Sequence, residues 1–304
     1  MSAVVDFIGV GAPRCGTSWL SNILRAHPDV CLSDPKEIRY FNRLLPPIGA
    51  ARGKPNPNAE KGVDWYLAHF AHVRDGQICG EFSPNYLCDE AAPEAIRQVF
   101  PSAKLIVNLR NPIDRAYSHY CQTKRVGQCE LPTFEQAIEQ QFGYLEVSLY
   151  AKQLTRYLDC FDRDQIFVTV FEELVSSPTT EIDRLYGFLG ITAEKGADPA
   201  RQDANRALSL RSKTVKNFAR TTSQALSSVG LGGVQRSLRR LGADRLWHKV
   251  MSKREVNPPL SATLRTELES YFEVDVAELE RLLDRDFSVW KSKGATVRKS
   301  ETND

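Results

Sequence analysis

The sequence lacks the features that mark several large classes of protein. Its seven cysteines are an odd number and include no CxxC pair, which fits free thiols better than a disulfide framework. No set of them has the spacing of a zinc site, so no metal is expected. No apolar run approaches the length that spans a bilayer, and the opening MSAVVDFIGVGA has no basic leader, which predicts a strand rather than a signal peptide. We therefore expect a cytoplasmic protein with no membrane span.

Excess charge is also small. The formal net charge of +2 argues against a general nucleic-acid-binding protein, so no nucleic-acid partner is expected. The charge is unevenly spread, because residues 206–254 contain 12 Lys and Arg side chains and one acid, Asp244. Such a block is either a solvated helical face or a wall for an anionic ligand, and the sequence leaves both alternatives open.

Short apolar runs alternate with helical patterns over the first 190 residues. The expected strands are residues 4–10, 78–82, 104–109 and 165–171. The expected helices are residues 17–26, 91–100, 112–120, 134–141, 149–161 and 177–189. This alternation predicts an α/β fold with a central, mostly parallel sheet that is covered by helices on both faces.

The last third of the chain lacks this alternation of strands and helices. Beyond residue 190 we expect only helices and loops, so the C-terminal part is helical. It includes a basic segment at about 206–256 and a last pair of helices at 262–271 and 274–283. We expect one domain over residues 1–291 and a disordered tail at 292–304.

The stretch GVGAPRCGTSWL joins the first expected strand to the first expected helix and looks like a phosphate-binding loop. Gly11 and Gly16 have the right spacing, but Thr17 stands where the Walker pattern has Lys, and Arg14 lies inside the loop instead. The pattern therefore predicts an anion smaller than a triphosphate, held by backbone N–H groups, Thr17, Ser18 and the Arg14 cation. The alternative is an ordinary glycine-containing turn.

A second stretch, LRNPIDRAYSHY, follows the apolar run KLIVNL. Asn111 and Pro112 are typical of a helix cap and first helical residue. Arg110 then lies at the end of a strand and Ser118 two turns into the next helix, where both can face a phosphate over the same sheet edge. The alternative is a surface Arg and a Ser that faces solvent.

Together the two stretches resemble the phosphate-binding elements of sulfotransferases that use 3′-phosphoadenosine 5′-phosphosulfate (PAPS). The segments DPKEIRYFNR, GEFSPNYL, FEELVSSPTTEIDRLYGFLGI and NPPLSATLRTELESYFEVDVAELERLLDRDFSVW are similar to the branch with heparan sulfate sulfotransferases and bacterial relatives. The resemblance covers residues 4–290 and is weakest from about 192 to 256. It implies a P-loop-like three-layer α/β/α fold, PAPS as co-substrate, and a 3′-phosphate site at Arg110 and Ser118.

The resemblance also implies roles in catalysis. The Glu of the matching Lys-Glu motif is the expected base, which is Glu37 here, although Glu37 could instead only pair with Lys36 or Arg39 at the surface. The phenol and steroid branch uses His, and none of the five histidines occupies that place. Arg14 stands where most members have Lys. Arg14 can stabilise the leaving phosphate but is a poor proton donor, so Lys36 is the candidate second cation.

The remaining donor contacts follow from the same resemblance. Cys15 and Gly16 belong to the loop around the 5′-phosphosulfate, and Trp19 either stacks on adenine or packs in the core. A helix N-terminus and a cation would lower the pKa of Cys15, but we expect Cys15 to act as a spacer rather than a nucleophile. Arg211 and Lys213 are the candidates that complete the 3′-phosphate site.

The acceptor is expected to be a hydroxyl or amine of a carbohydrate or a small-molecule alcohol. Glu37, Phe82 and Ser83 are the candidate acceptor contacts. Heparan sulfate relatives often have Lys where this chain has Phe82, which weakens the case for a glycosaminoglycan acceptor. The alternatives are a P-loop nucleotide-binding, kinase-like enzyme and a binding module without catalysis.

Overall fold

Five parallel strands form the central sheet of the protein, seen here in a computed structural model that describes residues 5–44, 54–140, 143–193, 208–210, 252–254 and 260–290. The strands are β1 (Val5–Gly11), β2 (Val30–Leu32), β3 (Ile78–Phe82), β4 (Lys104–Leu109) and β5 (Ile166–Val170). Their order is β2-β3-β1-β4-β5, so β1 lies in the centre and Ile8 is opposite Glu81 of β3 and Leu105 of β4. The predicted parallel sheet is confirmed.

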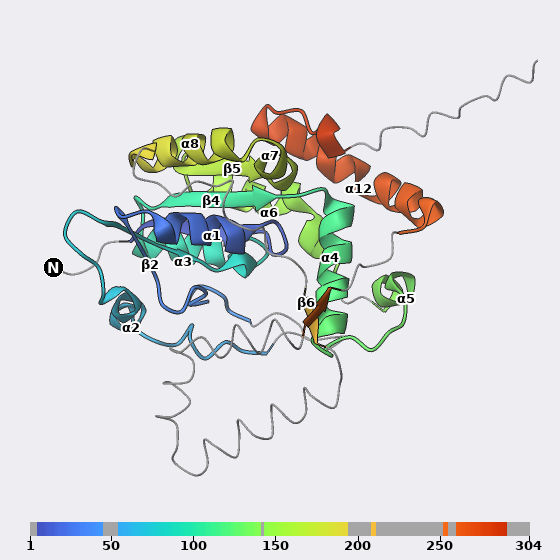
Figure 1. The fold of residues 1–304 in the computed structure, drawn as a ribbon, viewed down its shortest axis with the longest axis horizontal. Coiled ribbons are helices and arrows are strands. Elements are labelled where there is room, and N and C mark those ends of the chain that lie inside the picture. Colours follow the sequence, from blue (N-terminus) through green and yellow to red (C-terminus); the bar gives the residue numbers. More distant parts are fainter. Residues whose placement is uncertain are drawn as a thin grey trace, which may run out of the picture.

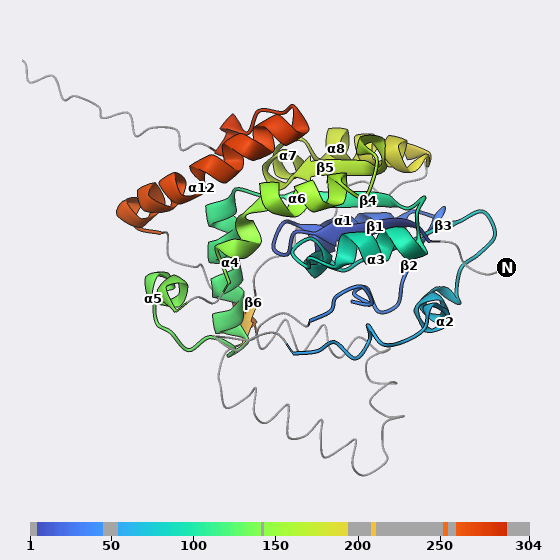
Figure 2. The ribbon, with the colours of Figure 1, turned by 180° about the vertical axis from the view of Figure 1, so that it is seen from behind.

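Helices cover both faces of the sheet, as Figures 1 and 2 show from opposite sides. On one face, α1 (Thr17–Ala26) and α8 (Pro178–Leu189) bury Leu20 and Leu185 against Phe7 and Ile106. On the other face lie α3 (Ala92–Val99) and α6 (Tyr150–Leu158), and α12 (Ala262–Leu283) packs against α6. The result is the expected three-layer α/β/α arrangement.

Shorter elements connect these layers. The remaining helices of the described residues are α2 (Val63–Leu67), α4 (Pro112–Arg125), α5 (Phe134–Glu139) and α7 (Phe171–Ser176). Single 3-10 turns are η1 (Ala68–Phe70), η2 (Pro84–Tyr86), η3 (Glu146–Ser148), η4 (Arg163–Gln165) and η7 (Ser288–Trp290). A separate antiparallel pair joins β6 (Leu208–Leu210) to β7 (Ser252–Arg254).

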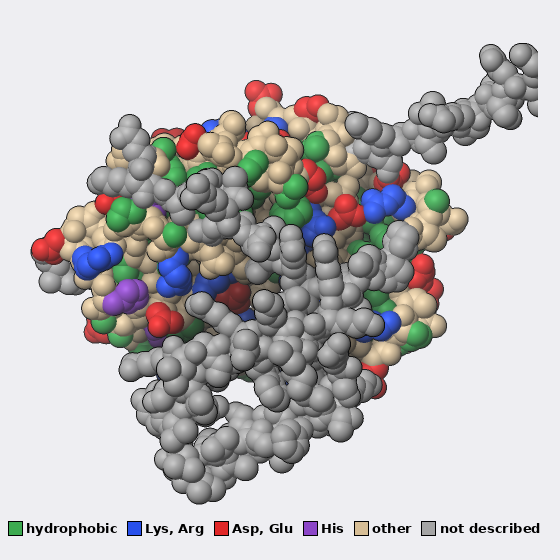
Figure 3. Space-filling view, in the orientation of Figure 1, with side chains coloured by type: hydrophobic (Ala, Val, Ile, Leu, Met, Phe, Trp, Pro, Cys, Tyr) green, Lys and Arg blue, Asp and Glu red, His purple; other side chains and the backbone are tan. Residues whose placement is uncertain are grey.

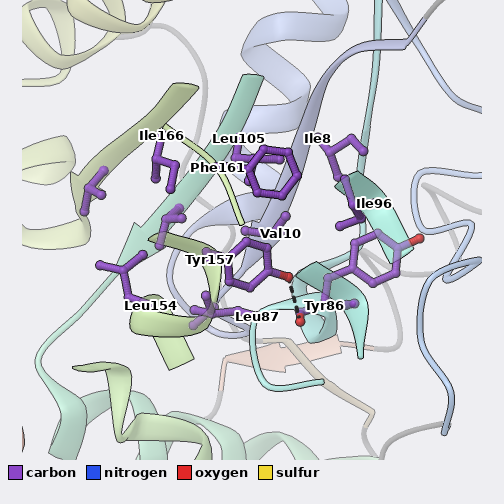
Figure 4. Close-up of a cluster of buried hydrophobic side chains, with 14 of the residues drawn as sticks. Ile8, Val10, Tyr86, Leu87, Ile96, Leu105, Leu154, Tyr157, Phe161 and Ile166 are labelled. Carbon is purple, nitrogen blue, oxygen red and sulfur yellow. Dashed lines mark hydrogen bonds between the residues drawn. The ribbon is translucent and has the colours of Figure 1, made fainter. Parts of the chain in front are cut away.

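The core beneath α3 and α6 is drawn in Figure 4. Ile8, Val10 and Leu105 of the sheet meet Leu154 of α6 in this cluster, and all four side chains are buried. The hydroxyl of Tyr157 donates a hydrogen bond of 2.9 Å to the backbone oxygen of Tyr86. This packing fixes the chain that follows β3 against the sheet.

Three differences from the sequence prediction have physical reasons. β2 was not expected, because a run of three residues is too short to show a period. The predicted last pair of helices is one helix, α12, since no Gly or Pro interrupts it near Phe272. The helices α2 and α7 were also missed, and both are only five or six residues long.

The region beyond residue 190 contains strands where only helices and loops were expected. β6 and β7 lie at the two ends of the basic block 206–254, and pairing between ends so far apart leaves no local signal in the sequence. The rest of this block, with Arg211 and Lys213, lies outside the described residues, as does the tail 292–304.

Side chains occupy outward-facing carbonyl oxygens on both edge strands of the sheet. On β2, the side chain of Gln77 donates to the backbone oxygen of Val30 (3.2 Å) and that of His72 to the oxygen of Leu32 (3.0 Å). On β5, Arg163 donates to the oxygen of Ile166 (2.7 Å) and Arg285 to the oxygen of Val168 (3.1 Å). Each of these carbonyl groups is therefore satisfied by a side chain rather than by a further strand.

Candidate active site

The candidate site lies at the edge of the sheet where the parallel strands end. Because all five strands run in one direction, the residues that follow them meet at the same edge. These residues are the loop 12–16 after β1, Lys36 and Glu37 after β2, Arg110 after β4 and Phe171 after β5. On the face shown in Figure 3, Lys and Arg side chains lie next to Asp and Glu, so its described part carries charges of both signs.

The loop after β1 is shaped to present the N-terminus of α1. Gly16 has φ of 84°, in the left-handed region that favours glycine, and a Cβ added there would lie 3.0 Å from the ring of Phe171. Among the described residues, no side-chain cap is seen at Gly16, the N-cap of α1. Free N–H groups and the positive end of the helix dipole make this position suitable for an anion.

Arg14 and Ser118 come together although they belong to different motifs. The Arg14 Nε donates to Ser118 Oγ at 3.2 Å, and an Nη of Arg110 donates to the backbone oxygen of Arg14 at 3.3 Å. Burial and the positive charges of Arg125 and Arg110 lower the pKa of Arg14 to about 10. A bound anion would relieve the repulsion among these guanidinium groups.

Arg110 is held in place by an aromatic ring. Its guanidinium carbon lies 4.7 Å from the centre of the Phe171 ring, a cation–π contact. The Arg110 Nε is buried and has no hydrogen-bond partner among the described residues. Asn111 accepts from the backbone N–H groups of Ile113 and Asp114 and so caps α4, as predicted. This helix carries Ser118 toward the loop.

Lys36 reaches the start of α1 from the other side. Its Nζ lies 3.3 Å from Ser18 Oγ, 3.5 Å from Thr17 Oγ1 and 3.8 Å from a carboxylate oxygen of Glu37. Burial lowers the pKa of Lys36, and the Glu37 carboxylate partly opposes this shift. Lys36 therefore supplies a second cation at the place where the sequence suggested one.

Glu37 sits between two cations. One of its oxygens accepts from Arg39 at 2.7 Å, and the other faces Lys36. The Glu37 side chain is 31% exposed, so a second molecule can reach it. The ion pair with Arg39 foreseen as an alternative is present, and Glu37 also lies beside the anion-binding loop through Lys36.

Phe82 and Ser83, the two other candidate acceptor contacts, are both completely buried. Phe82 packs against Phe7 with ring centres 6.4 Å apart. Ser83 Oγ donates to Glu81 at 2.8 Å and accepts from the Arg39 N–H at 2.9 Å. This burial argues against the expected acceptor contacts, because neither side chain is open to a second substrate.

The environment of Cys15 differs from the one expected from the sequence. Its thiol is completely buried and lies 3.8 Å from the hydroxyl of Tyr150, and burial raises its pKa to about 11. The predicted lowering by the helix and the cation is wrong, because desolvation of the thiolate dominates. Trp19 is half-buried and packs against the cluster between α1 and α8, which suits the core alternative.

Glu81 is a residue of the site that sequence reasoning missed. It is completely buried in β3 and accepts hydrogen bonds from Tyr66, Tyr86, Ser83 and the backbone N–H of Ile38. The available signal was an acidic residue inside the apolar run ICGEF, since buried carboxylates are rare without a specific role.

The described part of the chain has neither a cluster of metal ligands nor a helix that could span a membrane. No group of three or more His, Cys, Asp and Glu side chains suited to a metal was found among those residues. Nor does any helix among them have the length and apolar character to cross a membrane.

Comparisons with known proteins agree with this architecture. Heparan sulfate glucosamine 3-O-sulfotransferase 6 of Homo sapiens is 33% identical over 192 residues, which cover 60% of this chain and 51% of that protein. Bifunctional heparan sulfate N-deacetylase/N-sulfotransferase 4 of Mus musculus is 27% identical over 307 residues, covering 92% of this chain and 30% of that protein. The chain thus spans at most about half the length of these curated relatives.

A solved structure and a family also match most of the chain. The crystal structure of a sulfotransferase from Alicyclobacillus acidocaldarius superposes with a TM-score of 0.67 at 28% sequence identity, covering 95% of this chain and 99% of that one. The sulfotransferase domain family matches residues 5–258, which is well over half of the sequence. The resemblance first read from the motifs is confirmed, and the chain belongs to the sulfotransferase family.

Proposed function

We propose that this protein is an enzyme that moves the sulfuryl group of PAPS to a hydroxyl or amine of an acceptor. The observation that carries this proposal is the meeting of Arg14, Arg110 and Ser118 at the N-terminus of α1, from two motifs about a hundred residues apart. Family membership supports sulfate transfer as the reaction class.

The residues present suit a nucleotide with two separate phosphate groups. The uncapped N-terminus of α1 and Arg14 would hold the 5′-phosphosulfate, and the unpartnered Nε of Arg110 with Ser118 would hold the 3′-phosphate. PAPS, when bound, supplies the sulfuryl group and a phosphate leaving group. Arg14 and Lys36 then place positive charge where negative charge develops on that phosphate.

Glu37 is the proposed base. It stands 3.8 Å from Lys36, which in turn contacts Ser18 at the start of α1, so the base and the anion site are linked by one side chain. Glu37 accepts the proton of the acceptor hydroxyl or amine as that group attacks. For this step the oxygen paired with Arg39, or the one facing Lys36, must turn toward the acceptor.

The proposed acceptor is a carbohydrate hydroxyl or amine. The curated relatives named above are heparan sulfate sulfotransferases, which supports a sugar acceptor. A small-molecule alcohol is the competing outcome, because the buried Phe82 provides no cation for a polyanionic chain. A panel of acceptors decides between the two.

The test is transfer of radiolabelled sulfonate from PAPS to sugars, amino sugars, aliphatic alcohols and phenols. Label should appear in at least one acceptor with the native protein and be lost with Glu37→Gln. In a thermal-shift assay, adenosine 3′,5′-bisphosphate should stabilise the protein more than ATP with magnesium. Stabilisation by ATP and magnesium alone would instead favour a kinase-like enzyme.

A further inference from the structure

The segment that carries Lys36 and Glu37 has no regular secondary structure to hold it. Residues 33–39 follow β2 as bends and extended chain, and their backbone hydrogen bonds to β3 end at Lys36, whose oxygen accepts from the N–H of Phe82 at 3.3 Å. Glu37 nevertheless has to stand at a fixed place beside α1 if it is to act as a base, since a misplacement of about 1 Å can lower a rate roughly 10²-fold. The N–H groups that follow Lys36, those of Ile38, Arg39 and Phe41, are bonded by side chains instead.

The buried carboxylate of Glu81 forms a hydrogen bond directly to the backbone of this segment. Its Oε2 accepts from the backbone N–H of Ile38, the residue next to Glu37, at 3.3 Å. The same oxygen accepts from Ser83 Oγ at 2.8 Å, and the other oxygen accepts from Tyr66 at 3.0 Å and Tyr86 at 2.8 Å. Each oxygen of the carboxylate thus accepts two hydrogen bonds.

Because a carboxylate only accepts hydrogen bonds, it sets the direction of the bonds around it. The hydroxyls of Ser83 and Tyr86 both donate to Glu81 and keep their lone pairs for other donors. Ser83 Oγ accepts from the backbone N–H of Arg39 at 2.9 Å, and the Tyr86 oxygen accepts from the N–H of Phe41 at 3.4 Å. Three N–H groups of the segment 38–41 therefore end, directly or through one hydroxyl, on Glu81.

We propose that Glu81 is the positioning residue of the active site, holding the segment 36–41 so that Glu37 and Lys36 face the N-terminus of α1. This inference rests on the proposed function for its catalytic consequence. The geometry also explains why a carboxylate is kept in the core. Burial of Glu81 is unfavourable, but an amide at this position has one accepting atom and could accept only half of these hydrogen bonds.

Apart from Lys36, the donor site does not depend on this network. Arg14, Arg110 and Ser118 are held by the loop after β1, by Phe171 and by α4, none of which contacts Glu81 through a described hydrogen bond. Loss of the Glu81 carboxylate should therefore lower turnover while nucleotide affinity changes little. A general loss of folding would instead lower both.

The direct test is Glu81→Gln with Glu181→Gln as the matched control. Glu181 of α8 is also a buried carboxylate, which accepts from Thr169 of β5 at 3.0 Å and from Arg184 at 2.6 Å, away from the segment. In hydrogen–deuterium exchange, Glu81→Gln should raise the exchange rate of the amides of Ile38, Arg39 and Phe41 about tenfold. The Glu181 variant should leave these amides as in the native protein.

The kinetic readout separates positioning from general stability. Glu81→Gln should lower kcat roughly 10²-fold and leave the Kd for adenosine 3′,5′-bisphosphate near its native value. Ser83→Ala should lower kcat more than Tyr66→Phe, because both remove one donor to Glu81 but only Ser83 also holds a backbone N–H of the segment. This comparison still applies if Glu81→Gln fails to fold.

Unchanged exchange of the three amides in Glu81→Gln would overturn the positioning role, whatever the acceptor is. So would equal effects of Ser83→Ala and Tyr66→Phe on exchange. By contrast, altered exchange together with no sulfonate transfer by the native protein would leave Glu81 as the support of the segment and reject the proposed function.

Discussion

Glu81 should make the stability of the protein fall as pH rises through the neutral range. Burial raises the pKa of this carboxyl from 4.5 to about 7, while its four hydrogen bonds oppose the shift. Since the folded protein binds the proton more tightly than the unfolded chain, folding is favoured when Glu81 is protonated. This stabilisation is present at low pH and is lost between about pH 4.5 and pH 7, opposite to the behaviour of a salt-bridged carboxylate.

The size of the effect follows from the two pKa values. Linkage gives a loss on the order of 2–3 kcal/mol in the free energy of unfolding between about pH 5 and pH 8 from this single group. Urea unfolding at both pH values, for the native protein and for Glu81→Gln, isolates the contribution because other groups titrate alike in the two proteins. The free energy of unfolding of the native protein, minus that of the variant, should be lower at the higher pH by that amount.

A relative free energy that stays constant between the two pH values would refute this reasoning. It would mean that the hydrogen bonds fully compensate for burial and that the pKa of Glu81 is not raised. A relative free energy that increases with pH would mean that the carboxylate is stabilised by a positive charge not considered in this network.

Other predictions concern the anion site and the base. Arg110→Ala and Ser118→Ala should each weaken binding of adenosine 3′,5′-bisphosphate roughly 10- to 100-fold by calorimetry, with much less effect on adenosine 5′-phosphate; equal losses would contradict a 3′-phosphate role. Glu37→Gln should lower turnover on the order of 10²–10⁴-fold with nucleotide affinity nearly intact, and near-native turnover would place the base elsewhere. Gly16→Ala should cost about 1–2 kcal/mol of stability through its left-handed backbone, besides the crowding against Phe171; an unchanged Tm would argue against that conformation.

His119 is a poor substitute if Glu37 is not the base. Its ring lies against Tyr144, and burial, together with the positive charges of Arg115 and Arg14, lowers its pKa to about 3. A general base works best with a pKa near the working pH. His119 is therefore poorly suited to act as the base.

Features that depend on neighbouring residues could be predicted from the sequence. The strand KLIVNL and the cap at Asn111 follow from local composition, and both were placed correctly. The parallel sheet followed from the alternation of strands and helices, because a right-handed crossover leaves few other arrangements. The motifs around Arg14 and Arg110 were expected at one edge of the sheet for the same reason, and the structure brings them into contact there.

Features that depend on distant partners could not be predicted. Local charges favoured a lowered pKa for Cys15, but the structure buries the thiol against Tyr150, which is 135 residues away. The sequence suggested Ser83 as an acceptor contact, but its hydroxyl is hydrogen-bonded to Glu81 and to the backbone N–H of Arg39. In both cases burial, which no short window of sequence reports, decides the chemistry.

The occupied carbonyls on the two edge strands also affect how copies of this protein meet. An exposed edge with free backbone groups is a template on which a strand from another chain can add, which leads to aggregation or domain exchange. Here β2 is only three residues long, and side chains of Gln77 and His72 cover its outward oxygens. Arg163 and Arg285 do the same on β5. Among the described residues, these contacts leave fewer free carbonyl oxygens with which a strand of another copy could pair at either edge.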